Sequence, residues 1–171
     1  MEQQQPQGTL PEVKTQPAVS EVGSDGTLVE LVYDQVRRKT SFVVWQDGRW
    51  RFAPSFDNGA NRRIVPFSPE NNLIRTGALV LPSEPEEYGS DQDLVHEIQA
   101  YIRRYVDLTP AFERLTSYYV LLSWIYDAFN EVPYLRVRGD YGTGKTRFLL
   151  VVGALCHKAF FASGASTVSP I

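Results

Sequence analysis

The sequence contains a single cysteine, Cys156, and two histidines, His96 and His157. One cysteine excludes an internal disulfide and a zinc site built from several cysteines, and two histidines are too few for a histidine-based metal cluster. This composition favours a reduced intracellular setting, and we expect a cytoplasmic protein. No apolar run approaches the roughly 18–20 residues that a membrane-spanning helix requires, so we expect no membrane partner. The polar N-terminus also lacks the charged and apolar regions of a secretory signal peptide.

Acidic residues are missing from one end of the sequence. All twenty Asp and Glu residues lie between Glu2 and Asp140, and none follows. The net charge of −3 argues against a strongly basic nucleic-acid binder, although it permits a local basic patch. An apolar content of 43% and an aromatic content of 12% indicate a globular protein rather than a collagen-like or coiled-coil chain.

The first half of the chain divides into a tail and a β-rich module. Residues 1–26 are rich in glutamine and proline without an apolar period, which predicts a disordered tail. Residues 27–89 contain short β-type runs followed by an acidic linker, and they predict a small β-rich module. Asp47-Gly48 stands between two of these runs and predicts a hairpin, because glycine accepts the positive φ of a tight turn. Leu79–Leu81 is a candidate further strand.

Residues 90–130 predict a pair of antiparallel helices. Ser90 with Asp93 fits a capping-box-like start, and Thr109-Pro110 fits the start of a second helix. Apolar residues at helical spacing predict the buried faces. In the first helix these residues are Leu94, Ile98, Ile102 and Tyr105, and in the second they are Phe112, Leu115, Tyr119, Leu122, Ile125 and Phe129.

A phosphate-binding motif follows in residues 131–171. We predict a strand over 133–138, a glycine-rich loop over 139–146, a helix that starts near Lys145 and carries the apolar run 147–156, and a short strand over 159–162. The loop matches the pattern G-x-x-x-x-G-K-[ST], and the order strand, loop, helix is the context that this pattern requires. The predicted fold class is α/β: a truncated P-loop NTPase core, strand–P-loop–helix–strand, preceded by the helical pair and the β-rich module.

The residue types in the loop suit a nucleoside triphosphate. Glycines let backbone N–H groups approach the phosphates, and the helix that follows adds its N-terminal dipole. Lys145 would reach the β- and γ-phosphates, and the Thr146 hydroxyl would bind Mg²⁺. We therefore expect ATP and Mg²⁺ as cofactors. The predicted nucleotide-binding residues are Gly139, Asp140, Tyr141, Gly142, Thr143, Gly144, Lys145 and Thr146.

This loop, the run Tyr134–Arg138 before it and the run Ala159–Ala165 after it resemble the start of an AAA+-like P-loop ATPase core. The resemblance is closest to helicase- or primase-associated ATPases of phages, plasmids and integrated elements. It covers about 60 residues, from Leu108 to Ile171, and does not reach the β-rich module. It implies a link to DNA through the full-length protein and, since such ATPases usually form rings, a homo-oligomer for the complete protein.

A hydrolysing ATPase of this kind also needs an acidic strand end that holds Mg²⁺ and positions the attacking water. No acidic residue follows Asp140, and the upstream candidates Asp34 and Asp127 are poor substitutes because of their order in the chain and their setting. We therefore expect the N-terminal part of a longer ATP hydrolase, inactive in this length and binding nucleotide weakly at best. We name no catalytic residue.

Two other functions remain open. In the first, the β-rich module and the helices form a non-catalytic interaction protein with a vestigial P-loop. In the second, weaker one, the chain is a nucleotide or nucleoside kinase, for which no lid or acceptor residues are visible. Two basic clusters, 37–39 and 62–63, lie near aromatic residues such as Trp45 and Trp50, which would suit single-stranded nucleic acid, although we interpret both clusters as solvated turns. Arg136 and Arg138 are expected to pack against Glu131 or Asp127.

Overall fold

The computed structural model describes residues 14–58 and 62–162. The chain is mixed α/β, with two β-sheets and four α-helices in the described part. It divides into two compact units. Unit 1 consists of the residues up to Asn71 together with Pro82–Pro85, and unit 2 consists of Asn72–Leu81 and the residues from Glu86 onward.

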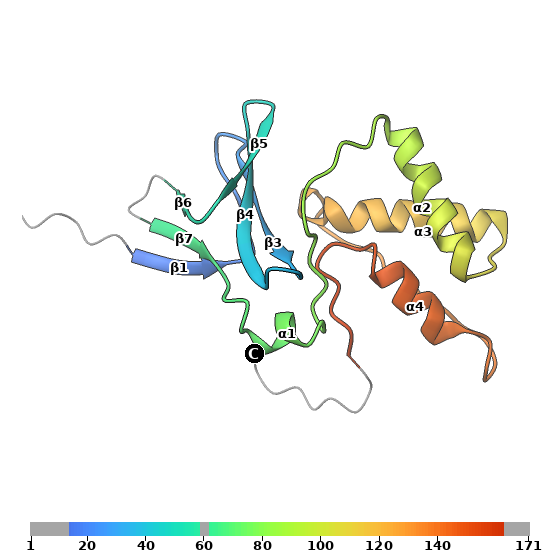
Figure 1. Ribbon diagram of the computed structural model, residues 1–171. Coiled ribbons are helices and arrows are strands. Elements are labelled where there is room, and N and C mark those ends of the chain that lie inside the picture. Colours follow the sequence, from blue (N-terminus) through green and yellow to red (C-terminus); the bar gives the residue numbers. More distant parts are fainter. Residues whose placement is uncertain (1–13, 59–61, 163–171) are drawn as a thin grey trace, which may run out of the picture. The chain divides into compact units, whose positions relative to one another are not determined.

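The larger sheet of unit 1 is antiparallel and has the strand order β2-β3-β4-β5 (Figure 1). The hairpin predicted at Asp47-Gly48 is confirmed. Both turn residues have positive φ, 52° and 75°, which matches the right-handed twist of the flanking strands. The strands are β2 (Ser20–Val22), β3 (Leu28–Asp34), β4 (Lys39–Gln46) and β5 (Arg49–Ala53).

The second sheet contains β1 (Lys14–Ala18), β6 (Phe56–Asp57) and β7 (Arg62–Pro66), in the order β1-β7-β6. Strand β1 runs parallel to β7, and Pro17 is tolerated because β1 is an edge strand. The prediction of a disordered tail over 1–26 is therefore wrong for residues 14–22, while residues 1–13 lie outside the described residues. The partner strand of β1 is distant in sequence, so local composition does not reveal the pairing.

Most of the buried side chains of the larger sheet lie on one face, and Val32 and Val43 are buried on the other. Cross-strand neighbours such as Leu31, Phe42 and Ala53 are buried on the first face, together with Ile64 from β7. Alternation along β3 and β4 sets this face, because successive side chains of a strand point to opposite sides. The buried residues of the unit are Thr27, Val29, Leu31, Val32, Phe42, Val43, Val44, Ala53 and Ile64.

Unit 2 is helical, and both predicted helix starts are confirmed. Ser90 and Asp93 form a full capping box, and the Thr109 hydroxyl accepts the N–H of Phe112 ahead of Pro110. No helix in residues 14–58 and 62–162 has the length and apolar character needed to cross a membrane. The elements are α1 (Asn72–Arg75), α2 (Asp91–Tyr105), α3 (Pro110–Trp124), the 3₁₀ turn η1 (Tyr126–Ala128) and α4 (Lys145–Gly153).

The buried face of α3 differs from the predicted one. Leu115 is exposed, whereas Glu113, Thr116, Ser117 and Val120 are buried. The small hydroxyl residues are satisfied within the helix, since Thr116 donates to Phe112 O at 2.8 Å and Ser117 to Glu113 O at 2.9 Å. The Glu113 carboxylate receives two bonds from Arg103 of α2, at 2.6 and 2.7 Å. Hydrophobicity alone misplaces this face because polar side chains with complete hydrogen bonds can be buried.

The helix α2 follows its predicted stripe more closely. Ile98 and Ile102 are buried and Leu94 packs against the same core, but Tyr105 is exposed, and its ring contacts that of Tyr101 at a tilt of 59°. The predicted strand Leu79–Leu81 does not join the β-rich module. Val80 N donates instead to Ala159 O, and Phe161 N donates to Ala78 O, around a single antiparallel bridge between Leu79 and Phe160 in unit 2. The predicted strand 159–162 is thereby reduced to this bridge.

Candidate phosphate-binding loop

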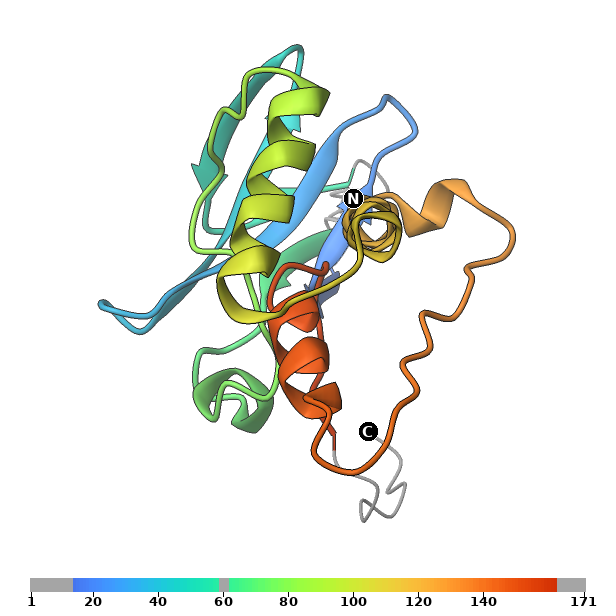
Figure 2. The same cartoon turned by 90° about the vertical axis from the view of Figure 1, so that its right-hand side faces the viewer.

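The segment that leads into the loop is extended but is not a strand. Residues 131–140 have no regular secondary structure, so the predicted strand over 133–138 is wrong. The alternation that suggested it is present: Leu135 and Val137 pack against the core of unit 2, while Tyr134, Arg136 and Arg138 are exposed. What is missing within the described residues is a neighbouring strand, and Figure 2 shows the segment (orange) running alone between η1 and the loop. Backbone pairing, rather than side-chain pattern, decides whether an extended segment is a strand.

Two glycines set the turn geometry of the loop. Gly142 and Gly144 have φ of 82° and 81°, a region that residues with a Cβ adopt at a cost of roughly 1–2 kcal/mol. Gly139 is required for a different reason, because a Cβ there would lie 2.6 Å from Thr143 Oγ1. That hydroxyl donates to Asp140 O at 2.8 Å and closes the turn. The glycines at 139, 142 and 144 thus fit the predicted role of clearing space along the loop.

The Lys145 side chain folds back over the loop. Its ammonium donates to Gly139 O at 2.9 Å and to Asp140 O, and it lies 3.4 Å from Thr143 Oγ1. Sequence reasoning did not find these backbone acceptors, because they are peptide oxygens that any residue type supplies. The positive charge is therefore held at the mouth of the loop, where an anion bound by the backbone would meet it.

The helix α4 begins at Lys145, as predicted, and ends at Gly153, three residues before the apolar run ends at Cys156. Its first internal hydrogen bond runs from Phe148 N to Gly144 O. The N–H groups of Gly144, Lys145, Thr146 and Arg147 have no partner among residues 14–58 and 62–162. Four free donors at a helix N-terminus beside an ammonium group form an arrangement that attracts anions.

The loop is anchored through the buried face of α4. Phe148 and Val152 are buried in the core of unit 2, and the Phe148 ring stacks on Phe112 of α3 with centroids 5.6 Å apart. At the other end of α4, a Cβ on Gly153 would lie 2.7 Å from the Phe161 ring, so the helix approaches the following chain closely there. Phe148 therefore ties the N-terminus of α4 to the helical pair.

The remaining predicted site residues are exposed. Tyr141 is fully exposed, and the Thr146 side chain, predicted to bind Mg²⁺, is exposed on the first turn of α4. Asp140 contributes its carbonyl rather than its carboxylate to the loop. The described residues contain no cluster of three or more His, Cys, Asp or Glu that could hold a metal ion. Any metal held here would need ligands from a bound phosphate in addition to Thr146.

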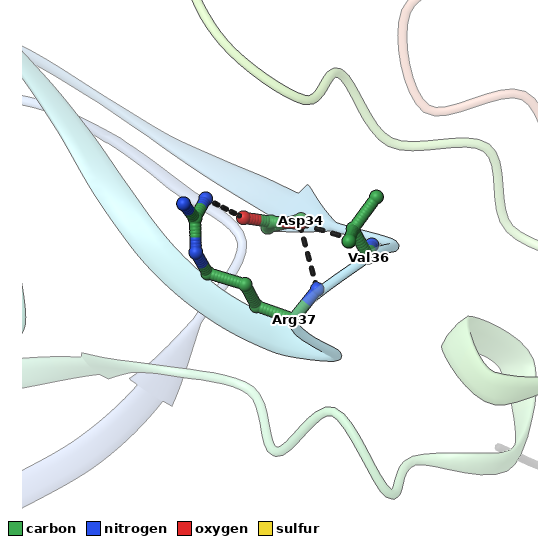
Figure 3. A network of polar contacts seen from close by, with 3 residues as sticks. All are labelled: Asp34, Val36 and Arg37. Carbon is green, nitrogen blue, oxygen red and sulfur yellow. Dashed lines mark hydrogen bonds and ion pairs between the residues drawn. The ribbon is translucent and has the colours of Figure 1, made fainter.

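The upstream acids do not replace the missing acidic element. Asp34 belongs to unit 1, where it organises the β3–β4 turn (Figure 3). Its Oδ1 accepts the N–H groups of Val36 and Arg37, and its Oδ2 pairs with the Arg37 guanidinium at 2.7 Å. The pKa of Asp34 is lowered mainly because its carboxylate accepts the hydrogen bond from the backbone N–H of Arg37. Asp127 lies in η1 and is exposed.

The basic residues singled out from the sequence fall into two groups. Arg37 lies in the β3–β4 turn and pairs with Asp34 at 2.7 Å, which fits the interpretation of a solvated turn. Arg62 and Arg63 pair with Glu21 and Asp57 at 2.6 and 2.7 Å, but they lie in strand β7, so the interpretation of a turn is wrong for them. Arg136 and Arg138 are exposed, and neither forms an ion pair with a described carboxylate, so the packing expected against Glu131 or Asp127 is not formed.

Comparison with known proteins gives no relative for this chain: no protein-family model, no curated protein sequence and no solved structure matches it.

Proposed function

We propose that residues 139–146 bind the phosphates of a nucleoside triphosphate, with ATP as the default ligand, and that the chain is the nucleotide-binding segment of a P-loop ATPase. The observation that carries the proposal is the row of four backbone N–H groups without a partner among the described residues, next to the Lys145 ammonium that lies over the loop. These N–H groups belong to residues 144 to 147, at the end of the glycine turn. A polyphosphate is the anion whose several oxygens can accept from all of these donors.

Hydrolysis is not part of what this chain supplies. The loop has no carboxylate after Asp140 to hold Mg²⁺ or to position water, and Thr146 would be the one protein ligand to the metal. The unpaired segment before the loop also leaves it without a rigid base, which lowers affinity because the loop must be ordered upon binding. The coupling of this segment to work on DNA in a mobile element, as the resemblance implies, belongs to a longer protein in this proposal.

The test is equilibrium binding of a fluorescent ATP analogue in the presence of Mg²⁺. Lys145→Ala removes a charge-assisted interaction worth about 1.5–3 kcal/mol, so we expect the dissociation constant to rise roughly 10- to 150-fold. Arg147→Ala is the matched control: it removes one positive charge from the same exposed turn of α4, outside the motif, and should leave binding within about twofold. Equal binding by wild type and Lys145→Ala would remove the proposal.

A second function, the non-catalytic interaction module, is favoured by one observation. Unit 2 exposes many large apolar side chains, more than isolated surface positions normally account for. In this alternative the P-loop is vestigial, and Lys145→Ala would leave the biological activity unchanged. The side chains are Leu115, Tyr118, Trp124, Ile125, Tyr126, Phe129, Val132, Tyr134, Leu149 and Leu150.

A further inference from the structure

The outer face of the four-stranded sheet in unit 1 carries a row of exposed apolar side chains. Because β2, β3, β4 and β5 are in register, Val22 pairs with Leu28, Leu28 with Trp45, and Trp45 with Trp50. All four are exposed, by 59%, 47%, 41% and 42%. Phe52, one step along β5 on the same face, is also exposed, and its ring meets that of Trp50 edge to face at 5.8 Å. We call Trp45, Trp50 and Phe52 the aromatic row.

Unpaired positive charge borders this row. Arg49 and Arg51 alternate with Trp50 and Phe52 along β5, so their side chains leave the opposite face of the sheet at this strand, and neither forms an ion pair with a described carboxylate. Strand β5 ends the sheet within the described residues, so the aromatic side chains and the arginines border the same open edge. From the start of β4 to the end of β5, residues 39–53 contain three basic residues, Lys39, Arg49 and Arg51, and one acidic residue, Asp47, in a chain whose net charge is −3.

This combination separates the β4–β5 ribbon from the other basic clusters. The arginines at 62 and 63 are neutralised by Glu21 and Asp57, and Arg37 by Asp34. On β5 the arginines form no ion pair with a carboxylate of residues 14–58 and 62–162, and the aromatic side chains leave the other face of the same strand. Stacking platforms joined to a positive groove are the means by which proteins hold single-stranded nucleic acid without reading its sequence.

We propose that the aromatic row together with Arg49 and Arg51 binds single-stranded DNA, with bases stacked on Trp45, Trp50 and Phe52 and with phosphates paired to the two arginines. Stacking and phosphate pairing would also hold single-stranded RNA, so the test compares oligo(dT) with oligo(U). This site is independent of the P-loop and gives the chain its own contact to DNA.

The experiment measures binding of a fluorescein-labelled 20-nucleotide oligo(dT) to the full chain by anisotropy at several salt concentrations. Trp50→Ala should weaken binding about 5- to 100-fold, the effect of removing the platform for one stacked base. Trp50→Phe keeps a ring and should recover most of the affinity. Because Trp50 also packs across the hairpin, circular dichroism of each variant establishes that the sheet is intact, and the arginine variants give a second readout that leaves the aromatic row in place.

Arg49→Glu with Arg51→Glu should reduce the slope of log affinity against log salt by about 1.4, or roughly 0.7 for each phosphate that the arginines no longer neutralise. Arg104→Glu makes the same arginine-to-glutamate change at a single site on α2 and should leave the slope unchanged. Phe129→Ala removes an exposed aromatic ring from unit 2 and should leave the affinity for oligo(dT) unchanged. Binding that is abolished equally in Arg104→Glu, or retained in both Trp50→Ala and the double arginine variant, would overturn the proposal. So would tighter binding of oligo(U) than of oligo(dT).

The test of the DNA site and the test of the nucleotide site give independent results. Trp50→Ala should bind the ATP analogue as wild type does, and Lys145→Ala should bind oligo(dT) as wild type does. Failure of the analogue to bind therefore leaves the DNA site standing, and failure of the oligonucleotide to bind leaves the P-loop proposal standing.

Discussion

Replacing Phe148 tests how the loop is held to the rest of unit 2. Phe148 is 2% exposed, stacks on Phe112 and belongs to a core of five buried residues. Removing a buried phenylalanine side chain typically costs about 3–5 kcal/mol, because its transfer energy is forfeited and a cavity is left behind. The adjacent Leu149 is 53% exposed, so Leu149→Ala should cost no more than about 0.5 kcal/mol. The expected difference between neighbouring positions is thus severalfold.

The assay is urea unfolding followed by tryptophan fluorescence. Trp124 reports on unit 2, since its Nε1 donates to Leu155 O just beyond α4, whereas Trp45 and Trp50 lie in unit 1. In a Trp45→Phe/Trp50→Phe background, Trp124 is the one tryptophan left of three. If Phe148→Ala leaves no folded unit 2, Phe148→Leu serves in its place, because leucine keeps most of the apolar volume. Its free energy of unfolding should lie between those of wild type and Phe148→Ala. Equal costs at positions 148 and 149 would refute the packing described for α4.

Two further predictions concern single local interactions. Ser90→Ala should lower the stability of unit 2 by about 1 kcal/mol, because Asp93 N loses its capping acceptor; thermal melts measure this, and an unchanged midpoint would contradict the cap. The pKa of Asp34 is lowered in the folded state, mainly by the Arg37 N–H, so its contribution to stability is present above the unfolded value near 3.8 and is lost as the pH falls through the lowered value. Asp34→Asn should therefore flatten the fall in the urea midpoint of unit 1 between about pH 5 and pH 2, and an unchanged profile would show that the turn contributes nothing.

Local signals predicted the parts of the fold that depend on neighbouring residues. The Asp47-Gly48 turn, the Ser90 capping box and the Thr109-Pro110 start all follow from one short stretch of chain, and all three are confirmed. The glycines of the loop belong to the same class, because positive φ at 142 and 144 is a local requirement.

Predictions that depended on distant partners failed. Strand β1 pairs with β7, more than forty positions later, and composition gives no sign of that partner. The run 133–138 has the alternation of a strand but no neighbour among the described residues to complete it. On α3 the buried Glu113 depends on Arg103 of another helix, so an apolar stripe on α3 alone could not identify the buried face.

The candidate sites divide in the same way. The phosphate-binding loop could be found from its motif, since one contiguous segment carries every residue of it. The aromatic row required the strand register, which brings Val22, Leu28, Trp45 and Trp50 together from four strands. From the sequence, the arginines at 62–63 were as good candidates as Arg49 and Arg51, and the ion pairs of the structure separate them.

The most direct measurement of the central claim is a map of backbone amide chemical shifts during titration with Mg-ATP. If the loop binds phosphates through its N–H groups, the largest changes should fall on residues 142–147, and they should vanish in Lys145→Ala while remaining in Arg147→Ala. Changes that are absent from 142–147, or that spread evenly over both units, would contradict the account.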